Sequence, residues 1–287
     1  MVWDDWVVGH EVTIRLGFFL GVFAIVACWE RFAPRRALTF PRPVRWLNNL
    51  ALLLLDGLAV RLLYPAAAAG IAALAGQRGW GLFNAHAAPL PLATVVSVIA
   101  MDGVIYLQHV MFHAVPALWR LHRVHHADPD CDITTGTRFH PVEIILSMLI
   151  KSAAILTLGP PVIAVVIFEV LLNGTAMFNH GNIRLPRRAD RVLRLFVVTP
   201  DMHRVHHSAH RDESDTNFGF NLPWWDRLFG TYRDQPRDGH LSMSIGLRGF
   251  HQPRQITRLP GMLLMPFVAG ADAHARSRQS GNTDSRD

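Results

Sequence analysis

The stretch RLHRVHHADPD at residues 120–130 shares the pentapeptide H-R-V-H-H with the stretch DMHRVHHSAHRD at residues 201–212. In each copy the histidines fall at positions i, i+3 and i+4. On an α-helix these positions lie on one face, about 5–6 Å apart at Cβ. Each pentapeptide therefore indicates a short helix that presents three imidazoles in one direction. Two explanations are open. Either the copies arose by duplication of a larger unit, or they bring imidazoles to one site from two directions.

The histidines are concentrated in one part of the chain, because eleven of the sixteen fall between His109 and His210. A third cluster, HVMFH at residues 109–113, has its histidines at i and i+4. Neutral imidazole is a common metal ligand, and such spacing lets neighbouring side chains share one ion or bridge two. Eight histidines exceed the needs of one tetrahedral ion, so the sequence favours two metals. The eight are His109, His113, His122, His125, His126, His203, His206 and His207.

The composition is typical of a polytopic membrane protein: half of the residues are hydrophobic and 17% are charged. A membrane-crossing helix needs about 20 apolar residues. Four regions approach this length, at residues 12–28, 46–74, 91–113 and 142–178. Gly159-Pro160-Pro161 interrupts the last region, which is therefore expected to form a helical hairpin. We predict an all-α bundle of four to five membrane helices, the first being a retained helix and not a cleaved signal.

The arginines predict the orientation. Five arginines crowd residues 31–45, whereas the loop before the third region holds only Arg78, and positively charged loops stay cytoplasmic. Counting crossings places all three histidine clusters in a cytoplasmic helical cap. The expected organisation is membrane helices at residues 1–90, a catalytic domain at 91–235, a C-terminal segment at 236–270 and a disordered tail at 271–287. Outside the pentapeptide the two halves share no pattern, which argues against duplication.

Several other classes of protein fit poorly. Cys28 and Cys131 are far apart, so neither a disulfide framework nor a C-x-x-C site is expected. Structural zinc sites usually recruit cysteine and close at four ligands. HVMFH lacks the glutamate of the H-E-x-x-H protease motif. A nucleic-acid role would account for the net charge of +6 but not for the membrane helices.

The three histidine clusters, together with four neighbouring segments, resemble the fatty acid hydroxylase and sterol desaturase superfamily. These segments are TTGTRFHPVEI, FNHGNIRLP, VTPDMHRVHHS and DTNFGFNLPWWDRLFGTY. The resemblance covers about residues 102–232. It implies a non-haem di-iron centre that uses O2 to hydroxylate or desaturate a lipid, without an organic cofactor. Cleavage of an ether lipid through hydroxylation, as in alkylglycerol monooxygenases, is a further alternative.

The resemblance also implies the ligand set, which comprises the eight clustered histidines and His180. A histidine one turn before His180 is frequent in this superfamily, but the chain has Ala176 there. His140 and Asn173 are the candidates to replace it as a tenth ligand, or else to form hydrogen bonds near the metals.

Other polar residues are candidates for a pocket around the metals: Asp102, Tyr106, Glu169, Asp212 and Asp226. Asp102 lies on the helix face of Tyr106 and His109, although a pairing with Arg61 explains it nearly as well. Glu169 shares a face with Asn173 and His180, and an unpaired carboxylate in lipid is costly. Arg123 and Arg204 are expected to pair with nearby carboxylates.

Oxygenation needs electrons from outside, since the sequence contains no Rossmann, C-x-x-C or haem motif. We therefore expect a separate ferredoxin- or cytochrome-type donor with its reductase. It would dock on the basic surface formed by Arg184, Arg187, Arg188 and Arg191. Two rival functions are a non-catalytic metal carrier and a di-zinc lipid hydrolase.

Overall fold

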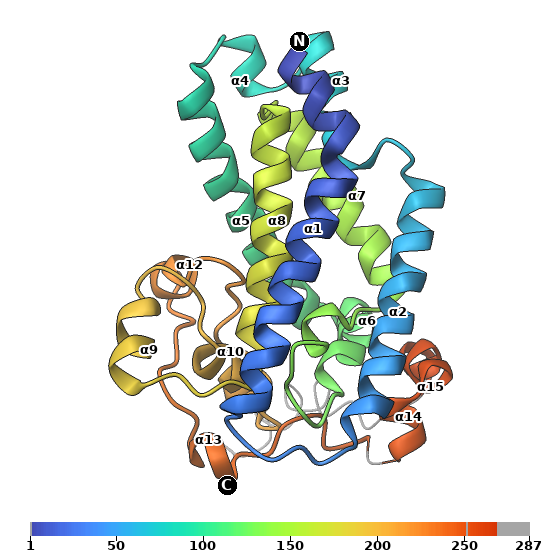
Figure 1. Cartoon of the computed structure of the whole chain (residues 1–287), viewed down its shortest axis with the longest axis vertical. Helices are drawn as coiled ribbons and strands as arrows, with labels where there is room; N and C mark the ends of the chain where they lie inside the picture. The colour runs from blue at the N-terminus through green and yellow to red at the C-terminus, as the bar shows by residue number, and fades with distance from the viewer. Residues whose placement is uncertain (1, 251, 269–287) are drawn as a thin grey trace, which may run out of the picture.

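The computed structural model describes residues 2–250 and 252–268, and its regular elements are helices (Figure 1). Six long elements form the membrane bundle: α1 (Val2–Phe32), α2 (Arg42–Leu63), α3 (Ala67–Arg78), α5 (Leu90–Ala114), α7 (Pro141–Leu158) and α8 (Val162–His180). The shorter elements are α4 (Leu82–Ala85), α6 (Pro116–His126), η1 (Thr135–Thr137), α9 (Arg187–Leu193), α10 (Pro200–His206), α11 (Arg211–Ser214), α12 (Trp224–Leu228), α13 (Gly239–Ser242), α14 (Pro253–Thr257), α15 (Leu259–Leu264) and η2 (Met265–Phe267).

Five segments are long and apolar enough to cross a membrane, which confirms the expected helical membrane bundle. They are Trp6–Phe32, Arg42–Ala85, Leu90–Ala114, Pro141–Leu158 and Val162–His180. The long second segment contains a break around Pro65, where α2 ends and α3 begins. The expected hairpin between α7 and α8 is present. Gly159 ends α7 with a left-handed φ of 64°, a conformation that costs glycine little, and the two following prolines prevent the helix from continuing.

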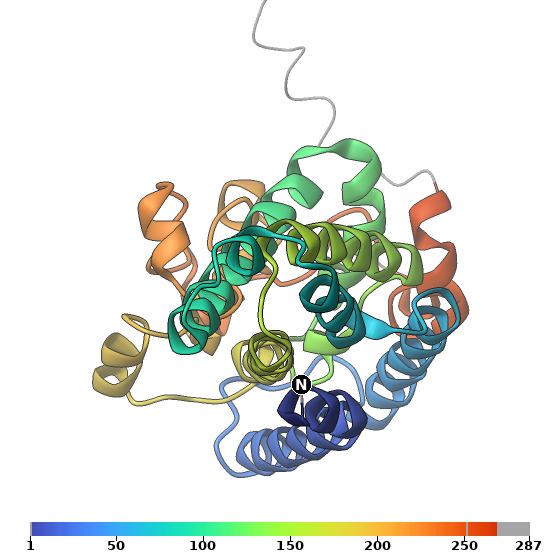
Figure 2. The same ribbon diagram turned by 90° about the horizontal axis from the view of Figure 1, so that it is seen from above.

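Helix α8 packs against α1, α3 and α5 (Figure 2). Because successive long helices run in opposite directions, the starts of α2 and α7 and the ends of α1, α5 and α8 lie at one end of the molecule (Figure 1). We call the short helices and loops that cover this end, residues 115–140 and 181–268, the cap. All three histidine clusters lie where the bundle meets the cap.

A buried arginine fixes the cap loop that follows α6. The guanidinium of Arg45 donates to both carboxylate oxygens of Asp128, at 2.9 and 2.7 Å, and also to Asp132. Burial alone would raise the pKa of Asp128, but the charge of Arg45 outweighs it and holds this pKa below its usual value. The start of α2 and the loop at residues 128–135 therefore form one rigid unit beneath the histidines.

The C-terminal part of the cap, residues 252–268, packs against α2 and α6. Met262 and Met265 are buried in a cluster with Leu52 of α2. Arg123 donates to the carbonyl oxygens of Met265 and Val268, so these contacts of Arg123 are with backbone and not with the expected carboxylate. Arg204 does pair with a carboxylate, that of Asp201. The predicted disordered tail, 271–287, lies outside the described residues.

Candidate metal centre

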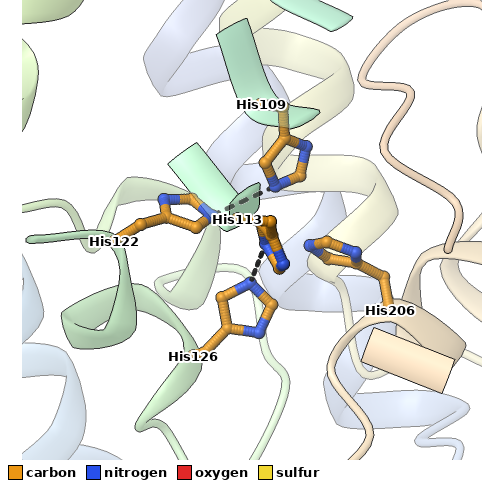
Figure 3. Close-up of side chains that lie close together, drawn as sticks. All are labelled: His109, His113, His122, His126 and His206. Carbon is orange, nitrogen blue, oxygen red and sulfur yellow. Dashed lines mark hydrogen bonds between the residues drawn. The ribbon is translucent and has the colours of Figure 1, made fainter. Parts of the chain in front are cut away.

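Five histidines form the first of two buried clusters: His109, His113, His122, His126 and His206. One ring nitrogen of each lies within 4.8 Å of the corresponding nitrogen of every other. Figure 3 shows these imidazoles converging from α5, α6 and α10. The Nε2 atoms of His109 and His122 are 3.0 Å apart, and those of His113 and His126 are 3.1 Å apart. Such short contacts between imidazole nitrogens suit a group of metal ligands.

Four histidines form the second cluster, again within 4.8 Å of one another: His125, His180, His203 and His207. The Nε2 atom of His180 is 3.1 Å from that of His125 and 3.1 Å from that of His203. The two clusters touch, since the rings of His126 and His207 stack with centroids 4.7 Å apart.

The two pentapeptides divide their histidines between the clusters in opposite proportions. The copy on α6 gives two histidines to the first cluster and His125 to the second. The copy at α10 gives His206 to the first cluster and two histidines to the second. Helix α5 adds two histidines to the first cluster, whereas α8 adds only His180 to the second. The expectation that one site is supplied from two directions agrees with this arrangement.

Backbone carbonyl groups orient several of these rings through their second nitrogen. The Nδ1 atoms of His109, His206 and His180 lie 2.7, 2.8 and 2.6 Å from the carbonyl oxygens of Phe218, Thr216 and Ala176. These contacts fix the ring orientation and leave Nε2 directed into the cluster.

Two carboxylates contact histidine rings in the same way. Glu143 Oε1 lies 2.6 Å from Nδ1 of His122, and Asp215 Oδ1 lies 3.3 Å from Nδ1 of His113. Glu143 was not among the candidates from the sequence. Its signal was an acidic residue at the start of an apolar helix. Asp215 belongs to the acidic loop after the third histidine cluster.

The chemistry of the site suits metal ions better than water. Burial lowers the pKa of His122 to about 3, and burial with neighbouring imidazoles holds the pKa of His125, His206 and His207 well below the usual value. The rings are therefore neutral and can donate a lone pair. Both ring nitrogens of His207 and Nε2 of His206 have no hydrogen-bond partner among the described residues. Buried polar atoms of this kind are costly unless a ligand satisfies them.

The two candidates for a tenth ligand differ in position. His140 caps α7 by accepting from the amide of Val142, and its Nε2 lies 3.2 Å from the carbonyl oxygen of Leu263, outside both clusters. These contacts correspond to the alternative that His140 only makes hydrogen bonds nearby. Asn173 lines the same cavity as Ala176, and its Nδ2 atom donates to the carbonyl of Glu169, so it stays a candidate.

Asp102 and Tyr106 hold a cap loop rather than line the approach to the metals. Asp102 Oδ2 accepts from Nε1 of Trp225 at 2.8 Å and from the amide of Leu222, so neither its pairing with Arg61 nor its pocket role agrees with the structure. The hydroxyl of Tyr106 lies 2.8 Å from Oγ1 of Thr231 in the same loop.

Asp226 holds together the loop at residues 217–232, to which it belongs. Its carboxylate accepts from the amides of Phe218 and Gly219, at 2.8 and 2.9 Å, and from the hydroxyl of Thr231. This loop positions the Phe218 carbonyl that orients His109. Asp212, by contrast, is exposed and pairs with Arg233 and Arg237 away from the metals.

A cavity of about 380 Å³ extends from the histidines into the membrane bundle. At one end it is lined by His109, His122, Phe112, Phe139 and Ala176. Further from the histidines, Glu169 lines it but is not unpaired as expected, because Lys151 and Arg15 approach its carboxylate at 2.8 and 3.1 Å. Ala176, one turn before His180 on α8, also lines the cavity.

Comparison with known proteins places this site in a family. The family model for fatty acid hydroxylase matches residues 94–231. Ornithine lipid hydroxylase OlsE of Rhizobium tropici is 27% identical over 241 residues, covering 80% of this chain and 70% of that protein. Human alkylglycerol monooxygenase is 30% identical over 139 residues, covering 47% of this chain and 29% of that protein. Rat cholesterol 25-hydroxylase is 24% identical over 151 residues, or 51% of this chain and 49% of that protein.

No solved structure matches the chain significantly. The matched segment, 94–231, contains all nine histidines of the two clusters and the loop that orients them. The expected resemblance is confirmed, and with it the interpretation of the chain as a membrane oxidoreductase that acts on lipids. Residues 94–231, just under half of the chain, thus form a fatty acid hydroxylase domain.

Proposed function

We propose that the chain hydroxylates a C–H bond of a membrane lipid at a centre of two iron ions. The observation that carries this proposal is the cavity, which joins the interior of the membrane bundle to His109 and His122 of the first histidine cluster. The overall reaction converts a C–H bond, O2, two electrons and two protons into an alcohol and water. When bound, a redox-active metal pair supplies the activation of O2 and the oxidation of the C–H bond. Zinc has no redox chemistry, which favours iron for this reaction.

The chain's own residues hold and shield the reacting groups. Five histidines would hold one ion and four the other, while Glu143 and the carbonyl of Phe218 keep His122 and His109 in the required orientation. Phe112, Phe139 and Phe220 line the cavity next to the histidines and exclude water from it. The cavity beside His109, His122 and Ala176 would take the lipid carbon and O2. Desaturation begins from the same C–H bond and is the alternative outcome.

The electron donor is expected at the exposed arginines of α9 and the loop before it. Arg184, Arg187, Arg188 and Arg191 are all exposed at the surface of the cap. An acidic ferredoxin- or cytochrome-type protein would be steered to this surface at low ionic strength. Reversing the four charges to glutamate should slow donor-supported turnover at least about tenfold at low salt. Unchanged turnover at low salt would reject the docking surface.

The histidine clusters are proposed to face the cytoplasm of a bacterial inner membrane. The arginine-rich segment between α1 and α2 supports this orientation, since it lies at the same end of the molecule as the cap.

Metal analysis combined with oxygen consumption tests the function. Purified protein reduced by a chemical donor should contain two irons per chain, consume O2 in the presence of lipid and add one oxygen to the lipid by mass spectrometry. Tightly bound zinc without oxygen consumption would instead support a lipid hydrolase. Readily exchanged metal without oxygen consumption would support a metal carrier.

The match to alkylglycerol monooxygenase supports one variant of the reaction. Hydroxylation of the carbon next to an ether oxygen would give an unstable hemiacetal that releases an aldehyde. Supplying matched ether and ester lipids distinguishes this variant, because only the ether lipid can yield an aldehyde of the chain.

A further inference from the structure

The turn after α9 and helix α12 together expose an apolar patch on the surface of the cap. The exposed fraction of its side chains runs from 45% at Trp224 to 69% at Leu228. The indole Nε1 of Trp224 donates to the carbonyl oxygen of Leu195 at 2.7 Å, so the two segments are in contact. We call this surface the α12 patch: Leu195, Phe196, Trp224, Leu228 and Phe229. Exposed apolar side chains gathered in this way mark a contact with protein or with membrane.

Helix α12 lies beside the membrane-crossing helix α5 (Figure 1). The ring of Phe229 stacks on that of Tyr106, with centroids 5.4 Å apart. The indole Nε1 of Trp225 donates to the carboxylate of Asp102 at 2.8 Å. Tyr106 and Asp102 precede the end of α5 at Ala114 by eight and twelve residues, about 12 and 18 Å along the helix axis at 1.5 Å per residue. The α12 patch is therefore alongside α5 and not beyond its end.

The length of α5 places this part of the cap at the depth of the membrane. A hydrocarbon core about 30 Å thick takes about 20 residues of a helix that crosses it at right angles, and more of a tilted helix. Counted from Leu90, the first residue of α5, about 20 residues extend as far as His109. Tyr106 and Asp102 fall within this stretch, together with the α12 segment that contacts them. Exposed apolar side chains at this depth would face lipid and not water.

We propose that the α12 patch is a membrane contact additional to the membrane-crossing helices, with its side chains inserted among the lipid head groups and the adjoining acyl chains. Tryptophan is enriched at this level of a bilayer, and apolar side chains of interfacial segments enter it by about 5–10 Å. The patch continues the lipid-facing surface of α5, where Leu107 is 56% exposed. The loop at residues 217–232 also carries the Phe218 carbonyl that orients His109, so the membrane would brace this loop.

Spin labels on introduced cysteines test this contact. The exposed Cys28 is replaced by serine, and Leu228→Cys or Phe196→Cys then supplies the site for a nitroxide label, while Cys131 is buried. The full-length protein is reconstituted into vesicles of phosphatidylethanolamine and phosphatidylglycerol. Power saturation measures collisions of each label with O2, which concentrates in lipid, and with a water-soluble nickel chelate. At both positions collisions with O2 should exceed collisions with the chelate.

Two other leucine positions of similar exposure are the controls. Leu107→Cys, on α5, should give the same excess of collisions with O2. Leu241, which is 65% exposed, lies on α13 at the end of the cap away from the bundle, so Leu241→Cys should give the reverse (Figure 1). The ratio of O2 to chelate collisions at positions 196 and 228 should match that at 107 and exceed that at 241 several-fold.

Two results would overturn the membrane contact. Chelate collisions at positions 196 and 228 as frequent as at 241 would show that the patch faces water and is free for a protein partner. Rare collisions with both reagents would show that a second copy of the chain covers it. If one labelled variant does not fold, the other position decides, and neither measurement depends on bound metal or on turnover.

Discussion

At the scale of single residues, the contact between Glu143 and His122 is expected to affect metal binding directly. A carboxylate on the second nitrogen fixes the ring and makes it a stronger donor. We expect Glu143→Gln to weaken metal binding about 10–100-fold with little change in fold. Equilibrium dialysis against limiting iron measures this change. Ser147→Ala, one turn further along α7, is the control, and equal loss of metal in both variants would contradict the assigned role.

Residues that repeat a pattern were easier to predict than residues that act alone. The eight clustered histidines could be found from their helical spacing, and all eight lie in the two clusters. Glu143 escaped notice because a single acid at a helix start is an ordinary feature. His140 was nominated because histidine is a frequent ligand, yet its side chain serves as a helix cap, which the sequence alone does not distinguish.

At the scale of elements, the loop at residues 217–232 depends on Asp226. The carboxylate has two acceptor oxygens for three donors, whereas an asparagine would place an amide against one of the backbone N–H groups. We expect Asp226→Asn to lower the free energy of unfolding by about 1–3 kcal/mol. Thermal unfolding measures the loss. An unchanged melting temperature would show that the loop is held by other contacts.

His240, on α13, makes the stability of the folded cap depend on pH. Burial lowers the pKa of His240 from 6.5 to about 4. An unfolded chain therefore binds the proton more readily than the folded one between these values. The contribution of neutral His240 to the free energy of unfolding is fully present above pH 6.5. It is lost as the pH falls toward 4 and amounts to roughly 3 kcal/mol.

His240→Gln should remove this part of the acid sensitivity. The melting temperatures of the wild type and the variant are measured from pH 7 to pH 4.5. The melting temperature of the variant should fall less over this range than that of the wild type. His86→Gln, at an exposed position, is the control and should follow the wild-type profile. A His240→Gln profile as steep as that of the wild type would contradict the assignment.

At the scale of the whole molecule, the main prediction is the orientation of the bundle in the membrane, with the cap on the cytoplasmic side. A cysteine introduced in place of Arg188, in the cap, should react with a membrane-impermeant thiol reagent only in inverted vesicles. A cysteine in place of His86, at the opposite end of the bundle, should react only in intact cells stripped of their outer membrane. Both positions are exposed. The reverse pattern would place the metal centre outside the cytoplasm.

The bundle could be predicted from the sequence because membrane helices are long and their apolar runs are continuous. A helical cap was also predicted, but the arrangement of its parts could not be, since its helices are short and are held by single contacts such as those of Arg45 and Asp226. The cavity was also beyond prediction. Its polar lining comes from Glu11, Asp56 and Glu169, which are far apart in sequence and meet only through the packing of the bundle.

The crossed sharing of histidines has a consequence for how the chain tolerates change. Each pentapeptide contributes to both histidine clusters, so the separation of the clusters is set by a single helical turn within each copy. A shift of either turn would move histidines of both clusters together. Metal bound at both clusters would link α6 to α10, which belong to segments that are distant along the chain. Natural variation is expected to preserve the spacing within each pentapeptide more strictly than the length of chain between them.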